Sequence, residues 1–134
     1  MEMDVYFPGG KKVFADFKGF TIETDQPVPS GGDNSAAAPF DLFLASIATC
    51  AGIFVLSFMQ ERNIPTDNAK ITMRWEYNRQ KHLIEKMILD LQLPAEFPER
   101  YKAAVVRAAE LCTVKRHLHD SPEFEINTII GASA

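Results

Sequence analysis

Apolar and polar residues alternate over three short segments in the first part of the chain. The segments cover residues 3–7, 13–17 and 20–24, and the turn sequences Pro8-Gly9-Gly10 and Lys18-Gly19 separate them. Alternation of this kind is typical of strands with one buried face, and short turns that contain glycine join neighbouring antiparallel strands. The N-terminal part of the chain therefore predicts a three-stranded antiparallel meander.

A long apolar segment, Pro39–Met59, follows a predicted loop at residues 25–38 that is rich in Pro, Gly and short polar residues. Asp41 is the only charged residue of this segment. Proline fits the first turn of a helix, and the Asp41 carboxylate would face the positive end of the helix dipole. A helix without a polar face predicts burial on every side. The remaining residues of a small domain are too few to surround this helix, so we expect a second subunit to cover part of it.

The uncharged run Leu42–Met59 is also about as long as the shortest segment that crosses a bilayer. No cluster of Lys or Arg and no belts of Trp or Tyr flank it, and the other segments have the pattern of a soluble domain. The sequence Met1-Glu2-Met3-Asp4 lacks the basic and apolar regions of a signal peptide. We therefore expect a core helix, no membrane association and a cytoplasmic protein.

The second half of the chain predicts two more strands, a helix and a final strand. Lys70–Tyr77 alternates strictly, and Leu83–Leu93 keeps most of its apolar residues on one face. Glu99–Cys112 has apolar residues at spacings of three and four, which predicts an amphipathic helix, and Glu123–Ile130 predicts a closing strand. The order lacks the strand–helix–strand alternation of a doubly wound sheet. It predicts an α+β fold in one domain, residues 1–134, with antiparallel sheets packed on a long central helix.

The composition allows a self-contained domain and argues against nucleic acid as a partner. With 134 residues, 46% of them hydrophobic, the chain can form a core of its own. Its formal net charge is −4, which argues against binding to a nucleic acid backbone.

The chain has two cysteines, Cys50 near the middle of the long apolar segment and Cys112 at the end of the amphipathic one. They could be unrelated buried thiols, a redox pair or part of a metal site. A metal site is disfavoured because the two lie far apart in sequence, without CxxC or HxxxH spacing, and His117 and His119 could join Cys112 only loosely. We expect no metal and no cofactor.

Four basic or imidazole residues come soon after Cys112: Lys115, Arg116, His117 and His119. Positive neighbours lower the pKa of a thiol, but the carbonyl end of a helix that stops at Cys112 would oppose this effect. A thiolate that attacks a peroxide becomes a sulfenic acid, and a second thiol within reach condenses with it to a disulfide. The spacing of the two cysteines allows such a pair without proving it.

Two motifs together resemble the OsmC/Ohr family of thiol-dependent hydroperoxide reductases. The first is residues 39–50, PFDLFLASIATC, and the second is residues 111–118, LCTVKRHL, followed by the predicted final strand. The resemblance covers nearly the whole chain in the order of its elements. It implies an OsmC-like fold, an intertwined homodimer with each active site at the subunit interface, Cys50 as the peroxidatic cysteine and Cys112 as the resolving one. The disulfide between them would be reduced by an external dithiol.

Two positions depart from the pattern of the family. The best-characterised branch has a glutamate directly after the proline, where this chain has Phe40, and the acidic residue here is Asp41. The family also uses an arginine of the N-terminal hairpin to stabilise the thiolate, and the matching turn is followed here by Lys11. Lysine supplies charge without the two-point hydrogen bonding of a guanidinium. Lys11, or alternatively Arg116, is the expected source of positive charge.

The sequence thus predicts a peroxidase that acts on hydroperoxides through Cys50 and Cys112. An alternative is a protein of the same fold that binds a small apolar ligand or senses redox state without rapid turnover. A third is a structural or interaction domain with inert thiols.

Overall fold

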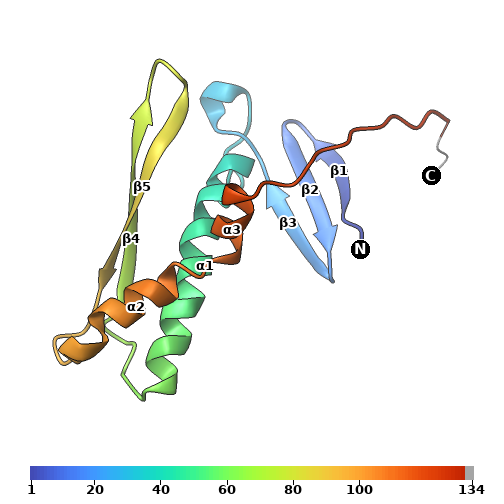
Figure 1. Cartoon of the computed structure of the whole chain (residues 1–134). Helices are drawn as coiled ribbons and strands as arrows, with labels where there is room; N and C mark the ends of the chain where they lie inside the picture. Colours follow the sequence, from blue (N-terminus) through green and yellow to red (C-terminus); the bar gives the residue numbers. More distant parts are fainter. Residues whose placement is uncertain (132–134) are drawn as a thin grey trace. The chain divides into compact units, whose positions relative to one another are not determined.

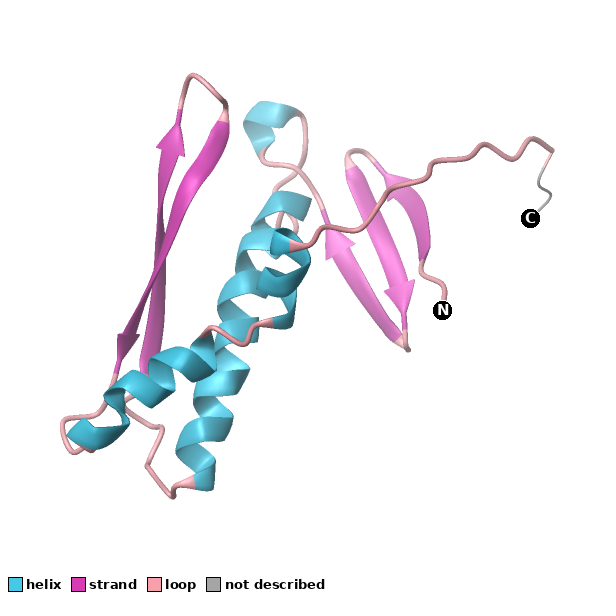
Figure 2. Ribbon diagram, in the orientation of Figure 1, coloured by secondary structure: helices cyan, strands magenta, loops and turns pink. Residues whose placement is uncertain are grey.

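The computed structural model describes residues 1–131 and shows a mixed α/β fold with two antiparallel sheets and one long helix, as predicted (Figures 1 and 2). Its elements, in chain order, are β1 (Asp4–Gly9), β2 (Lys12–Phe17), β3 (Phe20–Thr24), a 3₁₀ turn η1 (Val28–Ser30), α1 (Pro39–Glu61), β4 (Lys70–Asn78), β5 (Leu83–Gln92), a 3₁₀ turn η2 (Glu99–Tyr101), α2 (Lys102–Ala109) and α3 (Thr113–His119). The chain divides into two compact units, residues 1–49 and the part that begins at residue 50. That residues 1–134 form one domain stays a prediction.

The predicted N-terminal meander is confirmed. Strands β1, β2 and β3 form an antiparallel sheet in that order. Lys18 and Gly19 have φ values of 51° and 81° and join β2 to β3. Two successive residues with positive φ form the tight turn whose twist matches that of the strands it joins. The rings of Tyr6 and Phe14, which are paired across β1 and β2, make an edge contact with centroids 5.9 Å apart.

The loop at residues 25–38 is folded around the buried carboxylate of Asp25. It accepts hydrogen bonds from the main-chain N–H groups of Gln26, Asp33 and Ser35 and from the Ser35 hydroxyl. These donors hold the pKa of Asp25 well below its usual range. A Cβ on Gly32 would overlap the carbonyl oxygen of Gln26, so only glycine fits there.

Helix α1 is buried on one stripe within the single chain, although the sequence predicts burial on every side. The buried residues recur at spacings of three and four: Leu44, Ile47, Ala51, Val55 and Phe58, with Met59 beside Phe58. Ile53, on another face, is 53% exposed. The helix is long and apolar enough to cross a bilayer, a property that core helices of soluble proteins share. One chain therefore covers only part of its apolar surface.

The end of α1 is specified locally. Asn63 has a φ of 54°, and the N–H groups of Asn63 and Ile64 donate to the carbonyl oxygens of Gln60 and Met59. This left-handed pattern satisfies carbonyls at a helix C-terminus that would otherwise lack donors. Arg62 adds a hydrogen bond to the Phe58 carbonyl, and its guanidinium lies 3.6 Å from the Phe58 ring centroid. The chain then turns back toward β4.

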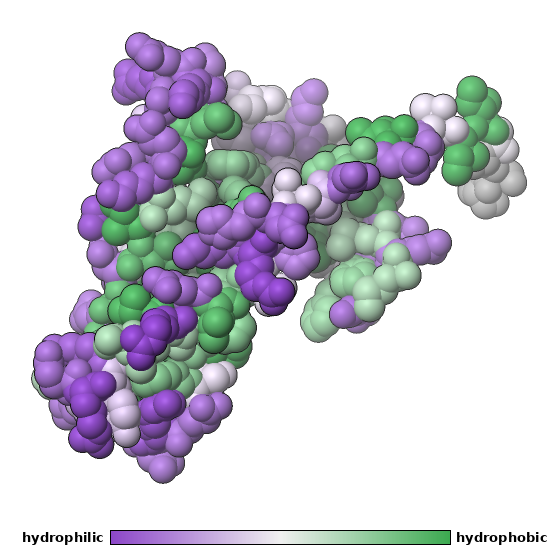
Figure 3. Space-filling view, in the orientation of Figure 1, coloured by the Kyte–Doolittle hydropathy of each residue, from purple (hydrophilic) through white to green (hydrophobic). Residues whose placement is uncertain are grey.

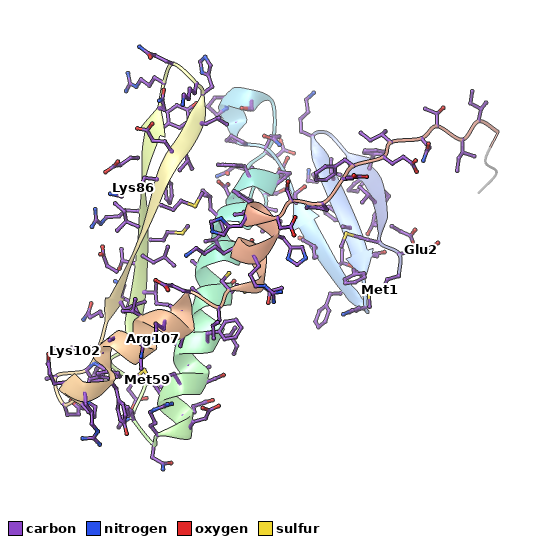
Figure 4. The ribbon with its side chains drawn as sticks, viewed as in Figure 1. Met1, Glu2, Met59, Lys86, Lys102 and Arg107 are labelled. Carbon is purple, nitrogen blue, oxygen red and sulfur yellow. The ribbon has the colours of Figure 1, made fainter. Side chains whose placement is uncertain are left out.

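The core of the second unit lies where α1, α2 and the β4–β5 hairpin meet. Its buried members are Val55, Phe58, Met59, Phe97 and Val105. Figure 4 shows Met59 at the end of α1 that lies beside α2. Burial of each such apolar side chain contributes about 1.5–3 kcal/mol to folding. This packing fixes α1 against α2 and so positions the segment that follows α2.

Of two predicted elements in the C-terminal part, the helix is confirmed except for its end, and the strand is wrong. The helix predicted over Glu99–Cys112 is instead η2 and α2, which stops at Ala109, and a new helix, α3, begins after Cys112. The strand predicted over Glu123–Ile130 is absent from the described chain, where residues 121–130 form no regular element. A strand needs a partner, and Phe124, Ile126, Ile129 and Ile130 of this segment are all more than 80% exposed.

Candidate active site

Cys50 lies on α1 at the edge of its buried stripe. It follows the buried Ile47 by three positions and is partly exposed. Gly52, two positions further on, would bring a Cβ within 3.8 Å of Ile71 in β4. Residues two apart in a helix point in nearly opposite directions. The β4–β5 hairpin therefore packs on one face of α1 and leaves Cys50 on another.

Cys112 is buried, with 1% of its surface exposed, and it lies at the N-cap of α3. Its φ of −53° and ψ of 121° are extended rather than helical, and its sulfur accepts a hydrogen bond from the Lys115 main-chain N–H at 3.4 Å. The first N–H groups of a helix lack partners within it, and a side-chain acceptor at the N-cap satisfies one of them. Cys112 thus begins a helix instead of ending one.

The start of α3 brings several donors to the sulfur of Cys50. The main-chain N–H groups of Val114 and Thr113 and the thiol of Cys112 all hydrogen-bond to it. Figure 1 shows α3 lying alongside α1. The two cysteines, far apart in sequence, are therefore in direct contact, and both are present as thiols.

These contacts shift the two thiols in opposite directions. The Val114 N–H, with smaller contributions from Cys112 and Thr113, lowers the pKa of Cys50 despite partial burial. Burial is the main cause that raises the pKa of Cys112, and its interactions with Cys50 act in the same direction. Cys50 is the residue that ionises first, and Cys112 is the protonated thiol that donates to it. This pair can supply a nucleophilic thiolate and a second thiol next to it.

Two observations bear on the charge at this site, which the sequence left open. Because Cys112 lies at the beginning of α3, the helix end next to the sulfurs is the positive one. The lowered pKa of Cys50 comes from main-chain and thiol donors, with no contribution from the basic side chains after Cys112. Lys115 and Arg116 are exposed instead.

Two predicted auxiliary residues, Lys11 and Asp41, lie in the first unit. The side chain of Lys11 lies over Gly31, 3.5 Å from where a Cβ would stand there. The Asp41 carboxylate accepts a hydrogen bond from the Ala38 main-chain N–H at 3.1 Å. This contact closes the first turn of α1, as a carboxylate at the third helical position does in a capping box. Their roles near Cys50 stay predictions.

The third auxiliary candidate, Arg116, is on α3, in the same unit as both cysteines. Its side chain is exposed, and its main-chain N–H donates to the Cys112 carbonyl oxygen at 3.0 Å. His117 contacts the Thr113 carbonyl oxygen through Nδ1 at 2.8 Å. Within residues 1–131, no three His, Cys, Asp or Glu side chains gather in a way that could hold a metal ion.

The main-chain donors of Thr113 and Val114 were not among the site residues predicted from the sequence. Motifs describe side chains, whereas these groups act through the backbone of a helix that was not predicted. A signal for that helix exists: Arg116, His117 and His119 suit a helix C-terminus, and Pro122 follows shortly after. The start was hidden because cysteine is not among the preferred N-cap residues.

Comparison with known proteins adds a family and a fold. A family model described as OsmC-like protein matches residues 32–127. Among solved structures, a candidate osmotic stress induced and detoxification response protein from Psychrobacter arcticus has a TM-score of 0.70 at 18% identity over 85% of each chain. A hypothetical protein from Aquifex aeolicus has a TM-score of 0.62 at 15% identity, over 90% of this chain and 87% of that one. No curated protein matches the chain.

A further solved structure is that of a protein whose name refers to hydroperoxides. The organic hydroperoxide resistance protein OsmC from Legionella pneumophila has a TM-score of 0.55 at 18% identity, over 87% of each chain. At this level of identity the similarity establishes a common fold.

Proposed function

The chain belongs to the OsmC family, and from this premise we propose that it reduces hydroperoxides with Cys50 as the attacking thiolate and Cys112 as the resolving thiol. The observation that carries the proposal is the contact between the two sulfurs, with the pKa of Cys50 lowered and that of Cys112 raised. The name of the Legionella neighbour, an organic hydroperoxide resistance protein, supports the same chemistry.

The proposed reaction has three balanced steps. The Cys50 thiolate attacks the outer peroxide oxygen, the O–O bond breaks, and the products are a sulfenic acid on Cys50 and an alkoxide that takes up a proton to become the alcohol. The Cys112 sulfur then attacks the sulfenic sulfur, and water leaves as the disulfide forms. An external dithiol returns two electrons and two protons through thiol–disulfide exchange and becomes a disulfide itself.

The local geometry supports this division of roles. Cys50 is partly exposed and can contact a substrate, whereas Cys112 is buried. In this proposal Cys112 reacts only with the oxidised Cys50. Donors at the Cys50 sulfur stabilise the thiolate before attack, and the adjacent Cys112 limits the time for over-oxidation. Lys11, Asp41 and Arg116 are proposed as auxiliary residues, with Lys11 or Arg116 supplying positive charge.

A homodimer is part of the proposal. The exposed Ile53 on α1 and the exposed apolar residues of segment 121–130 are surfaces that one chain leaves uncovered. Figure 3 shows further apolar surface between the β4–β5 hairpin and helices α2 and α3. Monomers rarely expose apolar surface of this extent without a partner.

The test is a single-turnover experiment with the reduced protein and no added reductant. We expect it to consume one equivalent of cumene hydroperoxide and to lose two hydrogens by mass spectrometry as the disulfide forms, and Cys50→Ser to consume none. Unchanged consumption by Cys50→Ser would reject the proposal. Slow oxidation without catalytic turnover in the presence of a dithiol would favour the redox-sensing alternative.

A further inference from the structure

The β4–β5 hairpin ends in a basic loop that has no role in the proposed reaction. Residues 79–82 of this loop, which include Arg79, Lys81 and His82, are all exposed. Within residues 1–131, the ion pairs involve other basic side chains, so neither Arg79 nor Lys81 has a carboxylate partner. The loop thus carries uncompensated positive charge in a protein whose formal net charge is −4.

Local hydrogen bonds give this loop a defined turn. The Asn78 side-chain oxygen accepts from the main-chain N–H groups of Gln80 at 3.0 Å and Lys81 at 3.1 Å, a contact that asparagine commonly makes in turns. The Asn78 amide also donates to the Glu85 carboxylate at 2.9 Å, so this acidic side chain is bound to an amide and not to a basic group of the loop. His82, with a φ of 54°, completes the reversal. The basic side chains are therefore presented by an ordered turn.

Apolar side chains next to the loop are exposed as well. Tyr77 and Leu83, near the two ends of the loop, are 53% and 61% exposed. Trp75 precedes Tyr77 by two positions, on the same face of β4, and is 47% exposed. Ile71, further along this face, lies over Gly52 of α1. The part of the hairpin far from the loop thus packs on the core, whereas the part next to the loop leaves aromatic and aliphatic surface uncovered.

The loop lies at one end of the second unit. Figure 1 shows α2 beside one end of the β4–β5 hairpin and the loop at the other end. The core around Val105 of α2 is at the end away from the loop. The loop can therefore contact a surface without any change in the packing of this core.

We propose that this end of the hairpin, residues 75–83, binds the surface of an anionic phospholipid bilayer. The basic loop contacts the lipid headgroups, and Trp75, Tyr77 and Leu83 enter the interfacial layer, where Trp and Tyr are enriched in membrane proteins. Each Lys or Arg near an anionic bilayer strengthens binding about fivefold, so the attachment is weak and reversible. It is peripheral, involves no spanning helix, and departs from the sequence-based expectation of no membrane association. It is independent of the two cysteines and goes beyond the proposed function.

A folded acidic protein fits this surface less well. A specific protein interface covers about 800 Å² and roughly 20–30 residues on each partner, more than a short loop and two strand ends provide. A bilayer requires no complementary shape, and segments that lie on it combine basic side chains with aromatic and aliphatic ones. Nucleic acid is disfavoured by the net charge of −4.

The test measures sedimentation of the full-length protein with large unilamellar vesicles. Vesicles that contain phosphatidylserine are compared with vesicles of phosphatidylcholine alone. We expect binding to the anionic vesicles only, and this binding should weaken with added salt because exposed charges are screened. Trp75 is the only tryptophan of the chain, so a blue shift of its fluorescence on binding reports that the hairpin enters the bilayer surface.

Two double variants locate the binding surface. Arg79→Gln/Lys81→Gln should bind the anionic vesicles about tenfold more weakly, or less still. Lys102→Gln/Arg107→Gln removes the same formal charge from α2, which Figure 4 shows at the end of the second unit away from the loop, and should bind as the unmodified protein does. Cys50→Ser should also bind normally, so loss of hydroperoxide consumption and loss of vesicle binding can be told apart.

The proposal is overturned if the protein does not bind the anionic vesicles or binds both kinds of vesicle equally. It is also overturned if the two double variants bind equally, or if binding leaves the Trp75 emission unchanged. Binding to soluble polyglutamate without binding to the vesicles would overturn it in favour of an acidic protein partner.

Discussion

The main-chain N–H of Val114 donates a hydrogen bond to the sulfur of Cys50, and this bond is the largest of the effects that lower the pKa of that thiol. Thr113 supplies a second N–H to the same atom. A negative sulfur at this place is stabilised by fixed dipoles, which need no counter-ion and are little affected by salt. Reactivity at Cys50 should therefore depend on the backbone at the start of α3.

Thr113→Pro removes one of these donors without disturbing the fold. Thr113 is the first residue of α3, where proline is favoured, and the ψ of 121° at Cys112 suits the residue before a proline. We expect the pKa of Cys50 to rise, so that alkylation by iodoacetamide reaches its full rate only at higher pH. Thr113→Ala keeps the N–H and should leave the pH profile unchanged. Equal profiles for both variants would contradict the assigned role.

The two substitutions of Cys112 should differ from each other. Serine keeps an O–H donor toward Cys50 and is a preferred N-cap residue, whereas Cys112→Ala lacks both and should destabilise α3 by about 0.5–2 kcal/mol. We expect Cys112→Ser to keep a reactive Cys50 that peroxide converts to sulfenic and then sulfinic acid, because no second thiol can resolve it. Mass spectrometry of the oxidised variant is the measurement. A Cys112→Ser protein whose Cys50 stays a thiol after peroxide treatment would contradict the proposed scheme.

Adjacent valines on α2 test the core. Val105 is fully buried in the cluster with Met59 and Phe97, whereas Val106 is 48% exposed. Val105→Ala removes buried methyl groups and leaves a cavity, so it should lower the free energy of unfolding by about 1.5–3 kcal/mol. Val106→Ala should change it by less than about 0.5 kcal/mol. Urea unfolding at fixed protein concentration measures both, and similar losses would mean that the burial on α2 is wrongly assigned.

The buried carboxylate of Asp25 predicts a pH dependence of stability. Its pKa is lowered in the folded state, so its contribution is present above the unfolded value of about 4 and is lost as the pH falls below it. Asp25→Asn leaves the same donors facing a neutral amide and should destabilise the protein at pH 7. The stability difference between the two proteins should shrink between about pH 5 and pH 3. Asp33→Asn, an exposed partner of Lys12, should have a small effect, as surface ion pairs generally do. A pH-independent difference would argue against an ionised Asp25.

The dimer is tested through α1. We expect solution scattering to give the mass of a dimer, and Ile53→Lys to shift it toward the monomer by placing a charge on the exposed apolar face of the helix. Ala103→Lys, at an exposed position on α2, is the matched control. If the wild-type protein is a monomer, or if Ile53→Lys leaves the dimer intact, the proposal that the chain dimerises through this face of α1 is rejected.

The sequence predicted those elements that a pattern within the element itself determines. Alternation located both sheets, and the long helix was predicted to end at Met59, close to its observed end at Glu61. The break before Cys112 was missed because the spacing of apolar residues continues across it. The strand at residues 123–130 has the right alternation, but a pattern cannot supply the neighbouring strand that hydrogen bonds require.

The candidate site was predicted only in part. That Cys50 and Cys112 form a pair was implied by the resemblance to the OsmC/Ohr family, since their separation in sequence allows many arrangements. That Cys50 is the thiol that ionises was also implied by the resemblance; the residues alone did not decide it, because the answer depends on where α3 begins. Lys115 and Arg116 were noted as positive neighbours that lower a thiol pKa, whereas the causes of the lowered pKa of Cys50 are the main-chain N–H groups of Val114 and Thr113 and the Cys112 thiol.

The N-cap of α3 is itself a sulfur, and this couples the folding of a short helix to electron transfer. A disulfide between Cys50 and Cys112 turns two acceptors into weaker ones at once, so the amides of Thr113, Val114 and Lys115 should exchange with deuterium faster in the oxidised protein than in the reduced one. Each turnover would then open and close the first turn of α3, and the oxidation state of the two sulfurs would become measurable in the mobility of the backbone around them.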